Sequence, residues 1–279
     1  MTTYLVSNEL LVRLVAFAGV FAGMAAWELL APRRSQHVGR ATRWPNNLGI
    51  VVLDTLLVRL AFPTTLTGLA LLAEARGWGL LNAFDVPWWL AVPVAVIALD
   101  LAIYLQHVLF HAVPALWRLH RMHHADLEFD ASTGVRFHPI EILLSMVLKL
   151  GLVAAIGAPA AAVVIFEVLL NATSMFNHGN VSIPPRLDRL LRWIVVTPDM
   201  HRVHHSVMVR ETNSNFGFNL PWWDRLFGTY RDQPEAGHIG MTIGIEQFRE
   251  AGEQRIDRML TQPFREDTRS YPLGQRDSR

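Results

Sequence analysis

Apolar residues along this chain are gathered into long runs. Three of these runs approach the roughly 20 apolar residues that a helix needs to cross a bilayer, and they predict membrane-spanning helices at Leu10–Leu30, Gly49–Ala73 and Trp88–Leu105. Ionisable residues inside a membrane are costly unless they pair with another helix or reach the interface. We therefore expect pairing between helices for the four that these runs contain: Arg13, Asp54, Arg59 and Asp100.

A fourth apolar region, Ile140–Met175, is longer and is interrupted by the sequence Gly157-Ala158-Pro159. Glycine is flexible and proline removes a backbone donor, so the interruption predicts a bend. Histidine-rich segments flank the region at 120–124 and 201–205. Only a helical hairpin that dips into the membrane and returns keeps these two segments on one side.

Basic residues indicate the orientation. The arginines between 33 and 43 follow the first apolar run instead of preceding it, which is typical of a retained anchor and not of a cleaved signal peptide. Further arginines follow the third run, whereas the connection 75–86 contains only Arg76. By the positive-inside tendency, we expect an external N-terminus, with the histidines and the C-terminus in the cytoplasm.

The C-terminal part of the chain is more polar. Spaced apolar positions between Gly244 and Phe264 predict an amphipathic surface helix, and the last dozen residues resemble disordered sequence. We divide the chain into N-terminal membrane helices (1–84), a histidine-rich region (85–232) and a cytoplasmic tail (233–279). The predicted fold class is all-α, with about three spanning helices and a membrane-dipping hairpin, hence four to five membrane helices, and a histidine-rich cytoplasmic cap.

Composition narrows the chemistry. Hydrophobic residues make up 51% of the 279 positions, and 25 basic against 24 acidic residues leave a net charge of only +1, so nothing points to nucleic acid as a partner. The chain contains no cysteine. Disulfides, zinc–thiolate sites, iron–sulfur clusters and a cysteine nucleophile are therefore excluded, and any metal must be held by nitrogen or oxygen.

Histidines are concentrated between His107 and His205, whereas the first 100 residues contain only His37. HVLFH places two histidines four residues apart, and HRMHH and HRVHH repeat the spacing i, i+3, i+4. Such spacings project imidazoles from one face of a helix, and neutral imidazole is a favoured ligand of iron, zinc and copper. A basic or pH-sensing surface does not require this repetition. Eight histidines exceed the needs of one ion and predict two metals, held by His107, His111, His120, His123, His124, His201, His204 and His205.

Together these motifs resemble the three histidine boxes of the sterol desaturase and fatty acid hydroxylase superfamily. The surrounding sequence is similar to the bacterial branch of that superfamily in RFHP at 136–139, NHGN around His178, LDRLLRW at 187–193, TPDMHRVHHS at 197–206 and WDRLFGTY at 223–230. The resemblance covers about residues 85–232, which makes this segment a hydroxylase-like or desaturase-like catalytic region.

The resemblance implies a membrane fold of about four helices, a cytoplasmic cap that carries the ligands, and O2-dependent oxidation of an unactivated C–H bond. The implied cofactors are two iron ions, with O2 as co-substrate. The implied substrate is a membrane lipid (a sterol, a fatty acyl group or a related lipid), and hydroxylation and desaturation are both open. No flavin, haem or ferredoxin motif is present, so a separate ferredoxin, cytochrome or reductase is expected to supply electrons. A bacterial inner membrane is the expected location.

Two further histidines are candidate metal ligands. His138 in RFHP and His178 in NHGN flank the predicted hairpin on the same side as the boxes. Each is either a ligand or a residue that orients one. Some relatives carry a paired histidine motif near His178, whereas this chain has Ser182 four residues further on. We expect His178 to be a ninth ligand and His138 to be a ligand or an orienting residue.

Polar and aromatic neighbours of the boxes are expected to have structural roles and not to bind metal directly. Asp199 is expected to cap a helix or to accept a proton from a ligand imidazole. The acidic residues after the second box are expected to be solvated or paired with Arg121 and Arg136; they are Asp126, Glu128 and Asp130. Aromatic residues of the membrane interface are expected at Trp222, Trp223 and Phe227. A turn that hydrogen-bonds to the last box is expected at Asn213, Asn215 and Gly217.

Two other classes of function are open at this point. A metal transporter or metal-binding membrane protein needs ligands inside its spans, whereas the histidine clusters lie outside them and Asp54 and Asp100 are isolated. A zinc-dependent membrane hydrolase would use zinc-bound water and would need neither O2 nor a reductant. The metal content of the purified protein discriminates between these classes, because iron supports the oxygenase and zinc alone the hydrolase.

Overall fold

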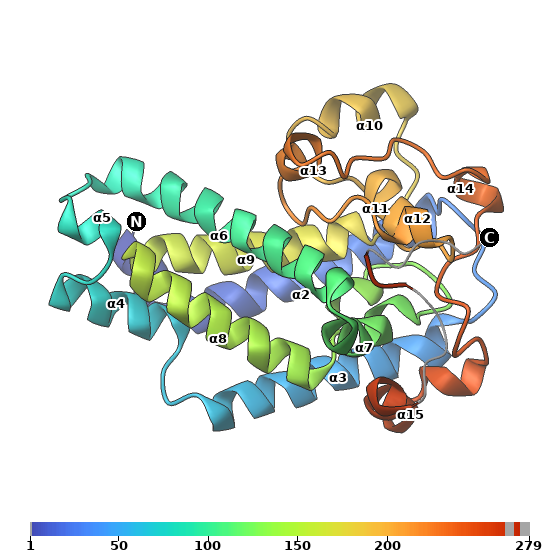
Figure 1. Ribbon diagram of the computed structural model, residues 1–279, viewed down its shortest axis with the longest axis horizontal. Helices are drawn as coiled ribbons and strands as arrows, with labels where there is room; N and C mark the ends of the chain where they lie inside the picture. Colours follow the sequence, from blue (N-terminus) through green and yellow to red (C-terminus); the bar gives the residue numbers. More distant parts are fainter. Residues whose placement is uncertain (1, 266–270, 274–279) are drawn as a thin grey trace.

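The computed structural model describes residues 2–265 and 271–273 (Figure 1). This part of the chain is helical, and its extended pairings are limited to two single bridges, Pro32 with Val181 and Ser206 with Ile243. The longer helices are α2 (Glu9–Leu30), α3 (Arg40–Ala61), α4 (Leu66–Arg76), α6 (Trp88–Ala112), α7 (Pro114–His124), α8 (Pro139–Ile156) and α9 (Ala160–Asn177). The shorter ones are α1 (Thr2–Ser7), α5 (Leu80–Ala83), η1 (Thr133–Val135), α10 (Pro185–Leu191), α11 (Pro198–His204), α12 (Val209–Thr212), α13 (Trp222–Leu226), α14 (Gly237–Gly240), η2 (Ala251–Gln254), α15 (Ile256–Thr261) and η3 (Gln262–Phe264).

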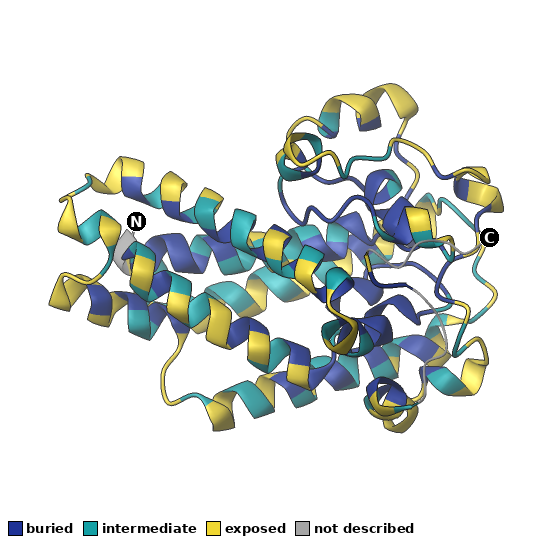
Figure 2. Cartoon of the chain, in the orientation of Figure 1, coloured by how far each residue is buried: buried dark blue, intermediate teal, exposed yellow. Residues whose placement is uncertain are grey.

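The long helices form an elongated bundle around α9 (Figure 1). α9 packs against α2, α4 and α6, while α8 packs against α3, α4 and α6. The outward faces carry exposed apolar side chains such as Leu14, Leu60 and Val147, and the inward faces are buried (Figure 2). Soluble proteins rarely expose so much apolar surface, and five helical segments are long and apolar enough to cross a membrane. These features are those of an integral membrane protein, and the predicted all-α membrane fold is confirmed.

The second predicted span, Gly49–Ala73, is divided between two helices. α3 already begins at Arg40 and ends at Ala61, before α4 begins at Leu66. Phe62 has φ −118° and ψ 122°, the extended conformation that a following proline favours, and Pro63 has no amide hydrogen with which to continue the helix. One continuous helix is thus corrected to two consecutive helices with a break at 62–65.

The long apolar region after the second histidine box folds as the predicted hairpin of α8 and α9. Its turn contains Gly157, which has φ +70° and lies so close to the backbone of the α4–α6 connection that a Cβ would be 2.6 Å from the carbonyl oxygen of Trp78. Only glycine accommodates both the conformation and the approach. Because Trp78 belongs to the end of the bundle that is remote from the histidines, the hairpin extends along the whole bundle instead of dipping only part of the way.

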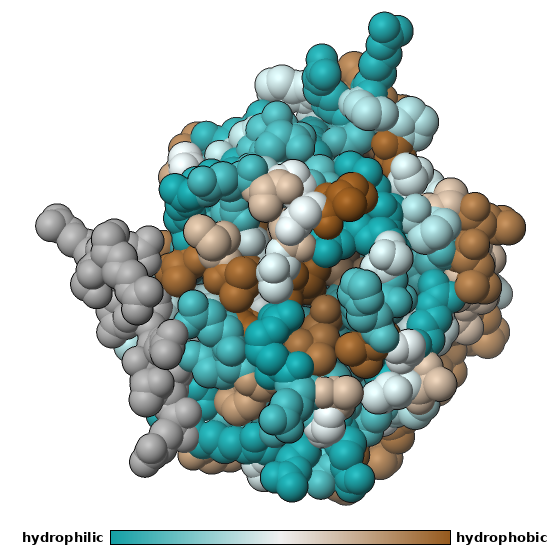
Figure 3. All heavy atoms as spheres, turned by 90° about the vertical axis from the view of Figure 1, so that its right-hand side faces the viewer, coloured by the Kyte–Doolittle hydropathy of each residue, from teal (hydrophilic) through white to brown (hydrophobic). Residues whose placement is uncertain are grey.

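The histidine-bearing elements form a cap at the other end of the bundle, where α3 and α8 begin and α9 ends (Figure 1). The N-terminal helix α1 packs against α9 at the opposite end. The end face of the cap is mostly hydrophilic, and its apolar side chains form only small patches (Figure 3). The cap and the N-terminus therefore lie at opposite ends of an apolar bundle.

The segment 244–264 does not form one amphipathic helix, as the sequence predicted, but contains the short helices η2, α15 and η3. Its apolar residues Ile245 and Met259 are buried against the cap instead of lying along one helical face. Of the last dozen residues, the structure describes three, among which Tyr271 is buried and stacks on Trp117 of α7. The rest of the tail that was predicted to be disordered lies outside the described residues.

The bundle predicts which segments share a side of the membrane, and the absence of cysteine from the sequence makes single-cysteine labelling free of background. Ala75 is exposed at the remote end, whereas Ser182 and Gln233 are exposed in the cap. A membrane-impermeant maleimide should label Ser182→Cys and Gln233→Cys from one side of the membrane and Ala75→Cys from the other. Labelling of the 75 and 182 positions from the same side would contradict this arrangement.

Candidate metal centre

Nine histidines meet in the cap as two adjoining groups. Within each group, one ring nitrogen of every residue lies within 4.8 Å of those of the others, and all nine residues are buried. The first group consists of His107, His111, His120, His124 and His204. The second consists of His123, His178, His201 and His205. The groups are in contact, since the ring centroids of His124 and His205 are 4.5 Å apart.

The spacing of the first two boxes explains how they supply the groups. Residues i and i+4 lie on one face of a helix, so His107 and His111 of α6 enter the first group together, as do His120 and His124 of α7. His123, one residue before His124, is rotated by about 100° around the helix and enters the second group instead.

The third box contributes two histidines to the second group and one to the first, whereas the second box contributes two to the first group and one to the second. His201 and His205, again four residues apart, both belong to the second group, while His204 belongs to the first. Each HxxHH motif therefore contributes to both groups. The sequence had placed the three rings of each triplet on a single helical stripe, and the structure divides that stripe between two neighbouring sites.

Hydrogen bonds on the outer side hold six of these rings. Their Nδ1 atoms face the carbonyl oxygens of Phe216 (His107, 2.7 Å), Arg136 (His123, 3.1 Å), Ser174 (His178, 2.7 Å) and Ser214 (His204, 2.7 Å), the carboxylate of Glu141 (His120, 2.7 Å) and the amide oxygen of Asn213 (His111, 3.2 Å). An acceptor at Nδ1 retains the proton there and leaves the lone pair of Nε2 directed inward.

The inner ring nitrogens lack protein partners. The Nε2 atoms of His107, His111, His120 and His204 are buried and find no hydrogen-bond partner in the part of the chain that the structure describes. In the second group, Nε2 of His178 lies 3.1 Å from Nε2 of both His123 and His205. Buried polar atoms normally have partners, and converging lone pairs of neutral imidazoles suit metal ions. The residues of both groups therefore fit metals.

Burial keeps the cap imidazoles neutral. It lowers the pKa of five of them well below 6.5, and the neighbouring histidines lower it further; these are His123, His124, His201, His204 and His205. Burial likewise lowers the pKa of His178 to about 3. Because a metal binds the deprotonated ring, these rings are in the binding form at neutral pH without having to release a proton.

The two additional candidate ligands have different positions. His178 lies directly after α9, and its ring is part of the second group. His138 caps the start of α8: its Nδ1 accepts from the amide of Ile140 at 3.2 Å, and its Nε2 faces the carbonyl of Leu260 at 3.3 Å. The structure thus brings His178 to the eight box histidines and does not bring His138 to either group.

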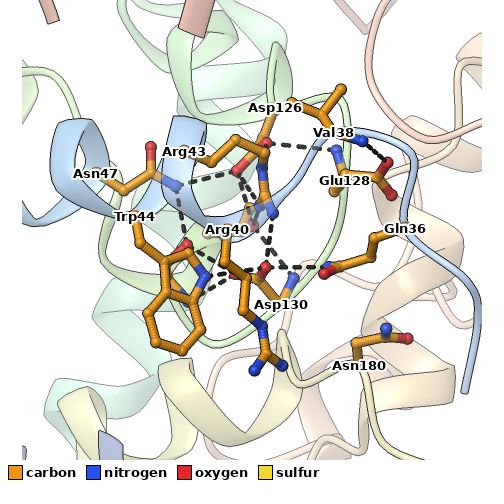
Figure 4. Close-up of polar contacts among 12 residues, drawn as sticks. Gln36, Val38, Arg40, Arg43, Trp44, Asn47, Asp126, Glu128, Asp130 and Asn180 are labelled. Atoms are coloured by element: carbon orange, nitrogen blue, oxygen red, sulfur yellow. Dashed lines mark hydrogen bonds and ion pairs between the residues drawn. The ribbon is translucent and has the colours of Figure 1, made fainter. Parts of the chain in front are cut away.

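Arg43 of α3 is the centre of a buried network behind the second box (Figure 4). Its guanidinium donates to both carboxylate oxygens of Asp126, at 2.6 and 2.8 Å, and to Asp130 at 2.6 Å. Burial alone would raise the pKa of Asp126, but the charges of Arg43 and Arg136 outweigh it and lower that pKa. These acidic residues are buried and not solvated, and the expected pairing with Arg136 is present for Asp126. Arg136 lies 3.9 Å from Asp126, and the main partner is Arg43.

Other polar residues near the boxes also have unexpected partners. Asp199 neither caps α11, whose cap is the hydroxyl of Thr197, nor bonds to a box histidine; it pairs with Arg33 at 3.1 Å and with Arg202. Its predicted role was therefore wrong. Asn213 bonds to His111 of the first box, while the expected hydrogen bond of its turn to the last box is made by the carbonyl of Ser214 with His204. Glu141, which fixes His120, was missed, because nothing in the sequence marks a carboxylate 21 residues away as a partner.

Asp100 of α6 attaches the cap to the bundle. Its carboxylate accepts from the backbone amides of Asn219 and Leu220, at 3.3 Å each, and from the indole of Trp223 at 2.8 Å. The partners of Asp100 therefore lie in the cap and not on another membrane helix. Trp223 is half-buried, whereas Trp222 and Phe227 are exposed. By contrast, Arg13 pairs with Glu167 of α9, as expected of a charge within a span.

A cavity of about 840 Å³ extends from the first histidine group into the bundle. His107 and His120 line one end of it, and residues of α2, α3, α8 and α9 form its walls. Leu14, Val52 and Leu56 line the cavity and are also exposed on the outer surface, so it opens toward lipid between α2 and α3. Its size and largely apolar walls are typical of a ligand site.

Fold and site together define a helical membrane protein with two buried histidine groups suited to metals, beside a cavity open to lipid. The fatty acid hydroxylase family model matches residues 92–229. These residues contain all three boxes and His178. The chain is thus a member of the sterol desaturase and fatty acid hydroxylase superfamily, and the resemblance of the boxes is confirmed.

Several characterised proteins are similar to this chain. The ornithine lipid hydroxylase OlsE of Rhizobium tropici is 29% identical over 192 residues, which are 68% of this chain and 55% of that protein. An alkylglycerol monooxygenase of Xenopus tropicalis is 29% identical over 59% of this chain and 35% of its own length. A cholesterol 25-hydroxylase of Rattus norvegicus is 26% identical over 58% of this chain and 53% of its own. The chain therefore spans about half or less of these relatives, and no solved structure matches it.

The Arg43 network predicts a stability effect. Replacing Arg43 by methionine leaves two buried carboxylates without their cation, and breaking a buried ion pair in this way costs about 3–5 kcal/mol. Thermal unfolding in detergent should show a large loss of stability, or the variant should fail to fold. The matched control is Arg255→Met, whose pair with Asp257 is exposed and whose loss should change little. Equal melting temperatures for both variants would contradict a structural role for the network.

Proposed function

We propose that this protein is a membrane di-iron oxygenase that uses O2 and external electrons to hydroxylate or desaturate a C–H bond of a lipid. The observation that carries the proposal is the position of the two buried histidine groups at the end of a cavity that opens toward lipid. The names of the relatives support the reaction class, because they are hydroxylases or monooxygenases named for an ornithine lipid, an alkylglycerol and cholesterol.

The nine grouped histidines would hold two iron ions, one in each group. The ligands are all neutral nitrogens, which suit iron as well as zinc and copper, so the assignment of iron rests on the family and not on the donor atoms alone. When bound there, the two irons would supply the reductive activation of O2 that oxidation of an unactivated C–H bond requires.

The protein's own residues orient the ligands and exclude water. Glu141 holds the Nδ1 proton of His120, and the carbonyl of Phe216 holds that of His107, so both rings present Nε2 toward the first group. The same two rings line the cavity. A lipid chain in the cavity would therefore bring a carbon to the first group, in an environment that bulk water does not enter.

The competing functions receive less support. A zinc hydrolase would account for the histidines, but the relatives whose names state a reaction are hydroxylases and monooxygenases. A transporter would need ligands distributed along the spans, whereas the two histidine groups lie together in the cap. We retain the oxygenase as the proposed function.

The partner and the orientation are part of the proposal. Electrons would come from a separate protein of the ferredoxin, cytochrome or reductase type. The N-terminus would lie outside a bacterial inner membrane, and the cap, with the histidine groups and the C-terminus, in the cytoplasm, as the arginines after α2 indicate. The opposite ends occupied by the N-terminus and the cap agree with this orientation (Figure 1).

The different positions of His178 and His138 predict different metal contents. Replacement of His178 by glutamine removes one of four nitrogens from the second group and should lower the iron content from about two ions per chain to about one, since water replaces a lost nitrogen ligand poorly. His138→Gln is the matched control and should retain both. Iron analysis of the purified variants measures this, and full iron content in His178→Gln would exclude it as a ligand.

Lipid analysis tests the reaction itself. Lipids extracted from cells that express the protein should contain a species that has gained one oxygen or lost two hydrogens, and a His124→Gln variant should not produce it. If the product is an alcohol, growth under ¹⁸O₂ should place the heavy isotope in it. Unchanged lipids, together with zinc instead of iron in the active preparation, would refute the oxygenase and favour the hydrolase.

A further inference from the structure

Lys149 is the only lysine in a chain whose other basic residues are 24 arginines. It lies in the middle of α8, within an apolar membrane helix. An ammonium group in such a position is costly unless it is paired. Nevertheless, Lys149 makes no hydrogen bond or ion pair with any residue that the structure describes, and its side chain lines the cavity. The functional site described above does not use this residue.

The cavity joins Lys149 to the histidines. Glu141, which bonds to His120, and Lys149 both line it from the same helix. Eight residues separate them along α8, which corresponds to about 12 Å at a rise of 1.5 Å per residue. The cavity thus has a histidine end and, about 12 Å deeper in the bundle, a second polar end.

The polar end contains charges that balance one another. Arg13 pairs with Glu9 at 2.9 Å and with Glu167 at 2.5 Å. The charged residues that line the cavity are three basic ones, Arg13, Arg59 and Lys149, and three acidic ones, Asp54, Glu141 and Glu167, so their formal charges cancel. Lys149 and Glu167 interact electrostatically but form no ion pair with each other within the described part of the chain. They therefore face the same space from α8 and α9 without closing it.

The balance of charges determines which chemical group of a ligand can bind between Lys149 and Glu167. A carboxylate or phosphate would bring an additional charge into a site among apolar membrane helices, where an uncompensated charge is costly. A hydroxyl adds no charge, and it can accept a hydrogen bond from the Lys149 ammonium while it donates one to the Glu167 carboxylate. An alkyl group would leave the ammonium without a partner.

We propose that Lys149 and Glu167 bind the uncharged hydroxyl group of a lipid whose hydrocarbon chain extends along the cavity to the histidines. This proposal rests on the proposed oxygenase function, and it specifies the substrate class as a long-chain or polycyclic alcohol. An extended chain advances about 3.6 Å per three bonds, so a distance of about 12 Å along α8 corresponds to roughly ten bonds. The oxidised carbon is therefore remote from the hydroxyl group.

The single lysine permits a binding test that needs no turnover. Full-length protein in phosphatidylcholine nanodiscs, whose lipids have no primary amine, is treated with hexadecanal and cyanoborohydride without added reductase. The aldehyde condenses with the Lys149 amine with loss of water, and reduction of the imine fixes the chain as a secondary amine. Peptide mass spectrometry then separates labelled Lys149 from the labelled N-terminus.

Competition by unlabelled C16 compounds decides the proposal. 1-Hexadecanol should protect Lys149 at concentrations at least about tenfold lower than n-hexadecane or palmitate, which is the order expected of hydrogen bonds to charged groups. Equal protection by hexadecane would show a purely apolar cavity, better protection by palmitate would show an anion site, and an unlabelled Lys149 would show an inaccessible structural charge. Each of these three results would overturn the proposal.

A variant locates the second hydrogen bond. Glu167→Gln should weaken protection by 1-hexadecanol about tenfold and leave protection by hexadecane unchanged. Glu74→Gln, an identical substitution at an exposed position of α4, should change neither. The comparison of competitors on the unmodified protein remains decisive if Glu167→Gln does not fold. Because labelling requires neither O2 nor electrons, selective protection combined with unchanged lipids in the expressing cells would refute the oxygenase while leaving the hydroxyl site in place.

Discussion

The burial of nine imidazoles in one place is the constraint on which the rest of this structure depends. Six of the rings have an acceptor of fixed position at their outer nitrogen, which leaves the inner nitrogen directed toward the neighbouring histidines. Those acceptors come from distant segments: Glu141 of α8, Ser174 of α9, Arg136 of the loop after the second box, and the loop 213–216. The segments of the cap surround the histidines in the way that places these acceptor oxygens beside the rings.

The arginine network solves a related problem at the border between cap and membrane. The loop after the second box carries Asp126 and Asp130, and both carboxylates are buried. Without a cation beside them, these buried charges would destabilise the fold. Arg43 enters from α3 and pairs with both. α3 therefore begins in the cap, well before the apolar run that the sequence marks as a span. α3 and the loop after the second box are in this way joined by buried ion pairs as well as by apolar packing.

The break between α3 and α4 connects the fold to its proposed substrate. Pro63 ends α3 early, and the residues of the break line the cavity beside α2, α8 and α9. A continuous helix would cross this region with its own side chains. The cavity consequently reaches from His107 and His120 to the balanced charges around Lys149, and its mouth faces lipid. The histidine end, the apolar middle and the polar end lie along one cavity, as the proposed site for a lipid with a single polar group requires.

The sequence by itself determined the first and third spans, the hairpin, the eight box histidines and the exclusion of cysteine-based chemistry, because apolar run length and the i, i+4 spacing are local properties of the chain. It did not show the break at 62–65 that divides the second span. Tertiary structure alone decided the division of each HxxHH motif between two groups, the inclusion of His178 and the separation of His138 from both groups. It also decided the partner of Asp126, which is Arg43, 83 residues away. Which side chains meet across such distances depends on how helices pack and on which buried charges must be compensated, and no local pattern encodes either.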